Sequence, residues 1–236
     1  MAVSSPIVYE VNEREQSDRW QSWLLPGLLT LCSTLPVILA RFPPLFDYPY
    51  WVLEAHVLAN IANYNNFYDF VWLIQPNLGS DIMLVPFTLF LGAEVAGRVV
   101  IAIYLFAFSF TFALLVRSIA GGATGAELLG PVFAYNTFFY TGNISFILGL
   151  PWMFLATRVI LSEQGRQTAR RYIIISALSV LALVFHLFAW LPILALVSVV
   201  FLLSPSTRAR RFIAATQVVP VIILMSYIVQ RLWLQS

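Results

Sequence analysis

Residues 42–59 read FPPLFDYPYWVLEAHVLA, and they place Asp47, Glu54 and His56 close together directly after an apolar run. Asp47 stands where a helix N-cap is expected, and Pro49 suits the first turn of the helix that follows. The stretch therefore predicts that one apolar helix ends before it and that a second, shorter helix begins inside it.

The second helix is expected over residues 48–62, and its periodicity decides which side chains share a face. Residues four positions apart lie one above the other on a helix, so Tyr50 and Glu54 lie on one face. Asp47 lies close to that face at the start of the helix, whereas His56 points elsewhere. Asp47 and Glu54 are therefore the candidate functional carboxylates of this stretch.

A further short helix is expected over residues 82–91, directly after the turn PNLGSD, with Asp81 near its N-terminus. Both helices are short and rich in aromatic residues, so we expect them to lie along a membrane surface. The segment between them is also rich in the aromatic side chains that are typical of a membrane–water interface: Tyr64, Phe67, Tyr68, Phe70 and Trp72.

The composition of the chain requires a membrane. Of its 236 residues, 60% are hydrophobic and 10% are charged, and its mean hydropathy is +0.84. A soluble domain carries about 25% charged residues, so this chain has too little polarity to cover a water-exposed surface. A formal net charge of +2 gives no reason to expect a nucleic-acid partner, and the single cysteine, Cys32, excludes an intrachain disulfide. The sequence therefore predicts an integral membrane protein in contact with lipid.

The apolar runs predict about seven transmembrane helices, since one span needs about 20 apolar residues. Two uncharged runs, 128–157 and 172–207, are too long for one helix, so each is expected to form two. The breaks are expected at YTGN, residues 140–143, and between His186 and Pro192. The remaining runs suit one helix each: 20–40, 99–116 and 212–228. The expected fold class is an all-α polytopic membrane protein.

The arginines decide the orientation, because cytoplasmic loops carry an excess of basic residues. With a cytoplasmic N-terminal tail over residues 1–19, ten of the thirteen arginines fall on the cytoplasmic side. Residues 20–236 then form a single transmembrane domain. Its first extracytoplasmic loop, residues 41–93, bears the two surface helices.

The order of these features resembles the GT-C superfamily of membrane glycosyltransferases, which includes protein mannosyltransferases and aminoarabinose transferases. The resemblance is carried by FDYPY after the first membrane helix, by QPNLGSDIMLVP entering the second surface helix, and by EVAGRVV opening the next membrane helix. It is closer to uncharacterised bacterial members with DYP and HLFA, which stand here at residues 47–49 and 186–189. The resemblance covers residues 20–210, and catalytic members are longer. It implies the N-terminal part of such an enzyme in a bacterial inner membrane.

A GT-C resemblance implies the transfer of a sugar from a polyprenyl-phosphate donor to an acceptor outside the cytoplasm. The acidic residue of the first loop serves in the family as a general base or in a metal-assisted acceptor site, and this role falls on Asp47. Glu54, on the same helix face, is the second catalytic candidate. A basic residue is expected to stabilise the leaving phosphate, and Arg98, with Arg41 behind it, is the candidate.

Asp81 and His186 complete the expected substrate-binding residues. Asp81 belongs to the same loop as Asp47, and His186 is alone in an uncharged run of 36 residues. Ionisable groups at such depth are costly and often functional. Since FDYPY holds a single acid, no set of metal ligands is predicted, and a divalent metal is the one cofactor that the resemblance suggests.

Each candidate residue also has a structural interpretation. Asp47 and Asp81 fit helix N-caps, and Glu54 fits a solvated position at the interface. Arg98 is placed to pair with Glu94 one turn earlier. The lone histidine is placed to hydrogen-bond the backbone where a helix is broken.

The main alternative to an enzyme is a small membrane subunit that packs against a larger membrane protein complex. The chain holds 19 Phe and 7 Trp residues and few polar residues between its ends, which suits lateral packing. A transporter is a third interpretation, but no inverted repeat is visible and His186 is the one residue deep enough to couple an ion.

Overall fold

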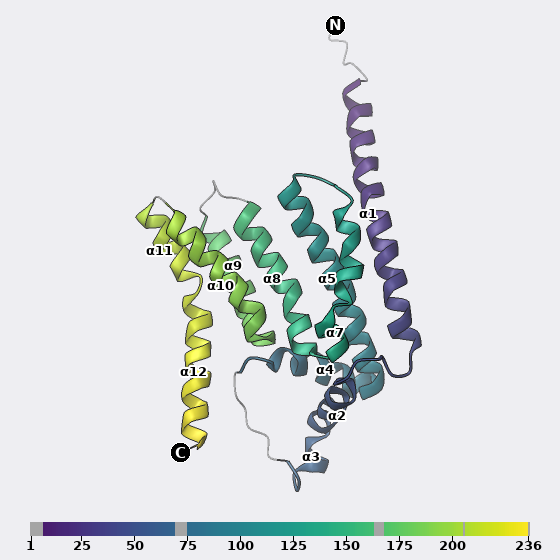
Figure 1. The fold of residues 1–236 in the computed structure, drawn as a ribbon, viewed down its shortest axis with the longest axis vertical. Helices are drawn as coiled ribbons and strands as arrows, with labels where there is room; N and C mark the ends of the chain where they lie inside the picture. The colour runs from purple at the N-terminus through teal and green to yellow at the C-terminus, as the bar shows by residue number, and fades with distance from the viewer. Residues whose placement is uncertain (1–6, 69–74, 163–167, 205, 236) are drawn as a thin grey trace.

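The computed structural model describes residues 7–68, 75–162, 168–204 and 206–235, and these residues form an all-α fold (Figure 1). The predicted interface residues Phe70 and Trp72 lie outside the described residues. The helices in chain order are α1 (Ile7–Leu39), α2 (Tyr48–Ala59), α3 (Ile61–Tyr64), α4 (Leu78–Leu91), α5 (Ala93–Ala120), the 3-10 helix η1 (Ala126–Leu129), α6 (Gly130–Ala134), α7 (Thr137–Thr141), α8 (Ile144–Ser162), α9 (Ala169–Phe185), α10 (Leu187–Leu203), α11 (Thr207–Ala215) and α12 (Val218–Gln235).

Helices α5, α8, α9 and α10 pack beside one another in the centre of the molecule, with α1 on one flank and α12 on the other (Figure 1). Helices α2, α3 and α4 gather where α5 begins, and we name this region the α2–α4 end. Helix α11 and the connection from α5 to α6 lie at the opposite end, named the α11 end. The helices that precede α5 and the connection that follows it therefore lie at opposite ends of the molecule.

The packing of α5 against its neighbours buries a cluster of aromatic rings. Tyr104 and Phe139 are fully buried and stack with their ring centroids 6.0 Å apart. The Tyr104 hydroxyl donates a 2.8 Å hydrogen bond to the carbonyl of Ala134, so it joins α5 to α6 without leaving a buried polar group unmatched. This cluster fixes the start of α8 and the short helices before it against α5.

The prediction of about seven membrane spans is wrong in number. In the described part of the chain, three helical segments are long and apolar enough to cross a membrane: Ala93–Ala120, Ile144–Leu161 and Arg210–Trp233. Helices α9 and α10 have 17 residues each, which gives about 25 Å, less than a hydrocarbon core of about 30 Å. The three segments indicate an integral membrane protein.

The breaks that the sequence predicts inside its two long apolar runs are present. Helix α7 ends at Thr141 and α8 begins at Ile144, with Gly142 between them at a φ of +79°. The chain turns again at His186, between α9 and α10, whereas Pro192 lies inside α10. The first long run does not give two comparable helices, because its first half forms the short pieces η1, α6 and α7.

Three short helices follow α1 within the expected first loop, where two were predicted. The helix expected over residues 48–62 ends at Ala59, and α3 follows it as a separate turn. Helix α2 begins at Tyr48, directly after Asp47, with Pro49 in its first turn. Helix α4 begins at Leu78, four residues before the predicted start, so Asp81 belongs to its first turn. Helix α1 begins at Ile7 and therefore includes most of the residues expected as an N-terminal tail.

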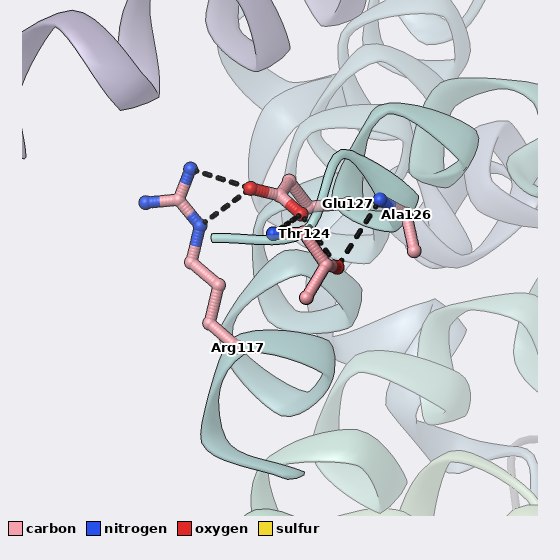
Figure 2. Close-up of polar contacts among 4 residues, drawn as sticks. All are labelled: Arg117, Thr124, Ala126 and Glu127. Carbon is pink, nitrogen blue, oxygen red and sulfur yellow. Dashed lines mark hydrogen bonds and ion pairs between the residues drawn. The ribbon is translucent and has the colours of Figure 1, made fainter. Parts of the chain in front are cut away.

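An ion pair between partly exposed Arg117 and buried Glu127 closes the connection from α5 to η1 at the α11 end. Figure 2 shows the Arg117 guanidinium beside the Glu127 carboxylate, with Nη2 and Oε1 2.9 Å apart. The second carboxylate oxygen of Glu127 accepts a 3.2 Å hydrogen bond from the backbone N–H of Thr124. The guanidinium also lies 3.8 Å from the ring centroid of Trp23 on α1. One carboxylate thus ties together a turn, α5 and, through Arg117, α1.

Replacement of Glu127 by glutamine is expected to lower the free energy of unfolding by about 2 kcal/mol, since it removes the charge that Arg117 pairs with. Thermal unfolding of the purified protein in a mild detergent measures this as a lower Tm. Glu94→Gln, which neutralises an exposed carboxylate, is the control. Equal Tm values for the two variants would contradict a stabilising role for the pair.

Candidate active site: a carboxylate pair between α2 and α4

The start of α2 is held in place by a buried tyrosine. Tyr48 is 1% exposed, and its hydroxyl donates a 2.9 Å hydrogen bond to the backbone carbonyl of Glu94 on α5. Burial raises the pKa of the Tyr48 phenol to about 12, against the opposing charge of Arg98, so the hydroxyl stays a donor. A Cβ atom at position 97 would lie 2.6 Å from the phenol oxygen, so Gly97 is required for this contact.

The same helix is anchored to the end of α7. The backbone N–H of Asp47 donates a 3.2 Å hydrogen bond to the Thr141 carbonyl. The Trp51 indole N–H donates a 2.8 Å bond to the Gly142 carbonyl. These two bonds satisfy backbone groups that α7 leaves open at its C-terminus, and they fix the direction of α2.

Helix α4 is anchored at its N-terminus to the start of α8 and the end of α9. The backbone N–H of Asn77 donates a 3.1 Å bond to the Phe185 carbonyl, and the buried Ser80 and Ser145 hydroxyls lie 2.8 Å apart. A Cβ atom at Gly79 would lie 2.5 Å from the Phe185 ring, so only glycine allows this approach. The first turn of α4, which carries Asp81, is therefore held rigidly.

Helices α2 and α4 pack against each other, and the charge of Glu54 on α2 acts on Asp81 of α4. Both side chains are half-buried, and one oxygen of each, Oε2 of Glu54 and Oδ1 of Asp81, is fully buried. Neither oxygen has a hydrogen-bond partner among the residues that the structure describes. Buried polar atoms are normally satisfied, so these two carboxylate oxygens make Glu54 and Asp81 candidate functional groups.

Burial disfavours the charged form of both carboxyl groups, and the charge of Glu54 acts in addition on Asp81. Burial, together with the charge of Glu54, raises the pKa of Asp81 from 3.8 to about 7. Burial also raises the pKa of Glu54. The pKa of the nearby Tyr50 is raised as well, first by the charge of Glu54 and then by burial and by Asp81. Glu54, Asp81 and Tyr50 therefore interact electrostatically. We name Glu54 and Asp81 the carboxylate pair.

A carboxyl group with a pKa near neutrality can take or give a proton at physiological pH, which suits general acid–base chemistry. The pair is less suited to hold a metal. Among the described residues there is no group of three or more His, Cys, Asp or Glu side chains that could hold an ion. A divalent metal, which the sequence leaves possible, would obtain two carboxylates here and the rest of its ligands from water or substrate.

Asp47 stands directly before α2, as predicted, but its side chain makes no capping hydrogen bond. It lies seven residues before Glu54, which corresponds to about 10 Å along a helix axis. Asp47 is half-buried and faces the end of α7, where a Cβ atom at Gly142 would lie 3.1 Å from its own Cβ. The structure thus brings Glu54 to Asp81 and leaves the catalytic role of Asp47 a prediction.

The hydrogen bonds of Arg98 and the ring contact of Arg41 involve neither Glu54 nor Asp81. Arg98 donates from Nε to the Glu94 backbone carbonyl and from Nη1 to that of Ile38, both at 3.4 Å, so it bonds the backbone of Glu94 and not its carboxylate. Arg41 is exposed, with its guanidinium 5.5 Å from the ring centroid of Phe42. Their phosphate-binding role stays a prediction.

His186 has a structural role at the turn between α9 and α10. Its Nδ1 accepts a 3.1 Å hydrogen bond from the Phe188 backbone N–H, and so caps α10. Its ring packs against Phe146 and Phe188. This agrees with the structural interpretation of the sequence, in which the histidine hydrogen-bonds to the backbone where one helix ends and the next begins.

Sequence analysis missed the pairing of Glu54 with Asp81. It placed Asp81 just before its helix as a cap, and it grouped Glu54 with Asp47 because Asp47 was expected close to the helix face that carries Glu54. One feature of the sequence does indicate the pairing. The chain has eleven acidic residues in total, and both Glu54 and Asp81 belong to the same loop. The contact itself depends on how α2 and α4 dock on α5, α7 and α8, which no local pattern contains.

Comparison of the chain with protein-family models, with curated proteins and with solved structures found no match.

Proposed function

We propose that this protein is a membrane glycosyltransferase that transfers a sugar from a polyprenyl-phosphate donor to an extracytoplasmic acceptor, with Asp81 as its general base. The observation that supports the proposal is the carboxylate pair: Asp81 has a pKa raised to about 7 and a buried oxygen without a partner among the described residues. A base works best when its pKa lies near the working pH. The GT-C-like order of sequence motifs supplies the substrate class.

In the proposed reaction, ionised Asp81 accepts the proton of an acceptor hydroxyl while that oxygen attacks the anomeric carbon of the sugar. The bond from the anomeric carbon to the phosphate oxygen breaks, and polyprenyl phosphate leaves with the electron pair. Burial, together with the charge of Glu54, keeps the pKa of Asp81 high enough for Asp81 to hold the proton, which then passes to water. Arg98 is proposed to stabilise the phosphate, because it lies near the start of α5, where the Tyr48 hydroxyl joins α2 to α5.

The proposed orientation places the α2–α4 end outside the cytoplasm and the α11 end inside. The three apolar helical segments support residence in a membrane, and the excess of arginines at the α11 end supports a cytoplasmic N-terminus. A bacterial inner membrane is the proposed location, since it provides polyprenyl-phosphate sugars at its outer surface.

The test is transfer of a labelled sugar from a panel of polyprenyl-phosphate donors by the purified protein in lipid nanodiscs. The proposal expects turnover that is lost when Asp81 is replaced by asparagine. Asp47→Asn is tested beside it, because the GT-C resemblance assigns the base to Asp47. Loss in Asp47→Asn with full activity in Asp81→Asn would move the base to Asp47 and refute the role of the pair.

A membrane subunit without catalytic activity is the second candidate, and the exposure of α12 favours it. Large apolar side chains on this helix have little cover from the rest of the chain, including Val229, Leu232 and Trp233 at 64%, 63% and 76% exposure. Such a face suits either lipid or a neighbouring membrane helix. A monodisperse monomer after purification in mild detergent would argue against the subunit.

A further inference from the structure

An apolar groove lies between α1 and α5, which pack side by side (Figure 1). It has a volume of about 660 Å³, and its lining comes from Ile38 on α1 and from one face of α5 between Val95 and Ala107. Phe106 lines both this groove and a second hollow of about 490 Å³, which continues between the same two helices as far as Trp23. We name the two hollows together the α1–α5 groove.

The α1–α5 groove is a long apolar path that begins at one cation. Arg98 is the one charged residue in its lining within the described part of the chain, and the lining residues beside it are apolar. From Arg98 to Ala113, the last lining residue on α5, the helix advances about 22 Å. A hydrocarbon core is about 30 Å thick, so the groove extends past the middle of a membrane. Its length and its charge suit a lipid with one anionic group and a long chain.

The charge of Arg98 is not neutralised by a carboxylate in the part of the chain that the structure describes. Its guanidinium bonds the backbone carbonyls of Glu94 and Ile38, both at 3.4 Å, which is longer than the about 2.7–3.2 Å of an ordinary N–H···O bond. No described carboxylate forms an ion pair with it. A cation within a helix apolar enough to span a membrane is costly and is usually paired. Arg98 therefore offers an anion a place at the mouth of the groove.

We propose that the α1–α5 groove binds polyprenyl phosphate, with the phosphate on Arg98 and the first isoprene units along α5. This lipid carries the donor sugar in the proposed function, on which the assignment rests. A guanidinium can donate two hydrogen bonds to one phosphate, which makes arginine a strong phosphate ligand. The groove begins near the start of α5, where the Tyr48 hydroxyl joins α2 to α5.

The order of chemical groups in the lipid favours polyprenyl phosphate over a phospholipid. In polyprenyl phosphate the hydrocarbon begins directly after the phosphate, and the groove likewise changes from Arg98 to the apolar side chains of Val95, Val99 and Ala102 within one turn of α5. A phospholipid carries a glycerol and two ester groups between its phosphate and its chains. Among the described residues, the lining beside Arg98 offers those polar groups no hydrogen-bond partner, and an unmatched polar group is costly there.

The experiment measures the Tm of the purified protein in a neutral detergent after addition of geranylgeranyl phosphate, a short polyprenyl phosphate. At about a hundred times its Kd, this probe is expected to raise the Tm by about 5 °C. Geranylgeraniol, short-chain phosphatidylglycerol and inorganic phosphate are each expected to give less than half of this shift. An equal shift with geranylgeraniol would overturn the role of the phosphate, one with phosphatidylglycerol would overturn the choice of lipid, and one with inorganic phosphate would overturn the role of the groove.

Variants locate the site. Arg98→Gln removes the phosphate ligand, and Ala102→Phe fills the groove without changing its charge; each is expected to reduce the geranylgeranyl phosphate shift to about a third. Arg231→Gln, which removes an exposed arginine of α12, and Val199→Phe, which enlarges an exposed apolar residue of α10, are the matched controls and should keep the full shift. If Arg98→Gln or Ala102→Phe keeps the full shift, or if a control loses it, the lipid binds elsewhere and the proposal is wrong.

This binding is measured without sugar transfer, so the groove and the proposed function can fail separately. A shift that depends on Arg98 and Ala102, in a protein without turnover, would support the lipid site and refute the transferase. Turnover in the wild type without a shift from geranylgeranyl phosphate would refute the α1–α5 groove and leave the transferase in place.

Discussion

Replacement of Asp81 by asparagine is expected to slow sugar transfer by about 100- to 10,000-fold, the range over which a general base contributes to catalysis. Asparagine has nearly the shape of aspartate but cannot accept a proton from the acceptor hydroxyl. The turnover number in nanodiscs, measured at saturating donor, reports this loss. Glu94→Gln is the control, since Glu94 is exposed and lies outside the pair, and it should retain full turnover.

The pH dependence of the turnover rate distinguishes a general base from a residue that only holds the structure of the site. The wild-type rate should rise as the pH passes about 7, because Asp81 must lose its proton to act. Glu54→Gln removes the negative charge that helps to raise the pKa of Asp81, so this rise should move to lower pH. If the rate of Glu54→Gln rises at the same pH as that of the wild type, the charge of Glu54 does not influence the pKa of Asp81.

The second large effect is expected from Gly142→Ala, at the junction that anchors α2. Gly142 has a φ of +79°, and a Cβ atom there would lie 2.7 Å from the Asp47 backbone nitrogen. The methyl group must therefore displace the start of α2 in addition to straining its own backbone. We expect a loss of about 3 kcal/mol in the free energy of unfolding, together with reduced turnover.

Gly121→Ala is the matched control for this variant. Gly121 has a φ of +75°, but no atom lies within 4 Å of the position of its added Cβ. Its replacement imposes the backbone strain without the contact, and is expected to cost about 1 kcal/mol and no turnover. Equal losses of Tm in the two variants would show that the anchor between α7 and α2 adds nothing to stability.

Features that depend on neighbouring residues could be predicted from the sequence. The start of α2 follows from Asp47 and Pro49, and the break before α8 follows from the glycine and asparagine of YTGN. The turn at His186 also follows from a single polar residue in an apolar run. In each case one or two residues that favour a helix end interrupt an apolar run, so the local pattern indicates the boundary.

Features that depend on packing could not be predicted. The number of spans was too high because hydropathy counts apolar residues without showing where helices stop, and α9 and α10 stop after 17 residues. The pairing of Glu54 with Asp81 requires Gly79 to admit Phe185 and Gly97 to admit Tyr48. Those close approaches connect residues far apart in the chain, and nothing in the local sequence around either acid indicates them.

The central claim is that Asp81 is held in a partly buried place that disfavours its charge, at a cost in stability. Because its folded pKa is raised from 3.8 to about 7, the folded protein binds this proton more tightly than the unfolded chain. The stabilisation is complete below a pH of about 4 and is lost as the pH rises through about 7.

The most direct test is the Tm of the wild type and of Asp81→Asn, measured across this pH range in the same detergent. The two proteins should have similar Tm values at a pH of about 4, and Asp81→Asn should be the more stable at a pH of about 8. If Asp81→Asn is instead less stable than the wild type by the same margin at both pH values, Asp81 is an ordinary structural carboxylate, and the carboxylate pair is not a site.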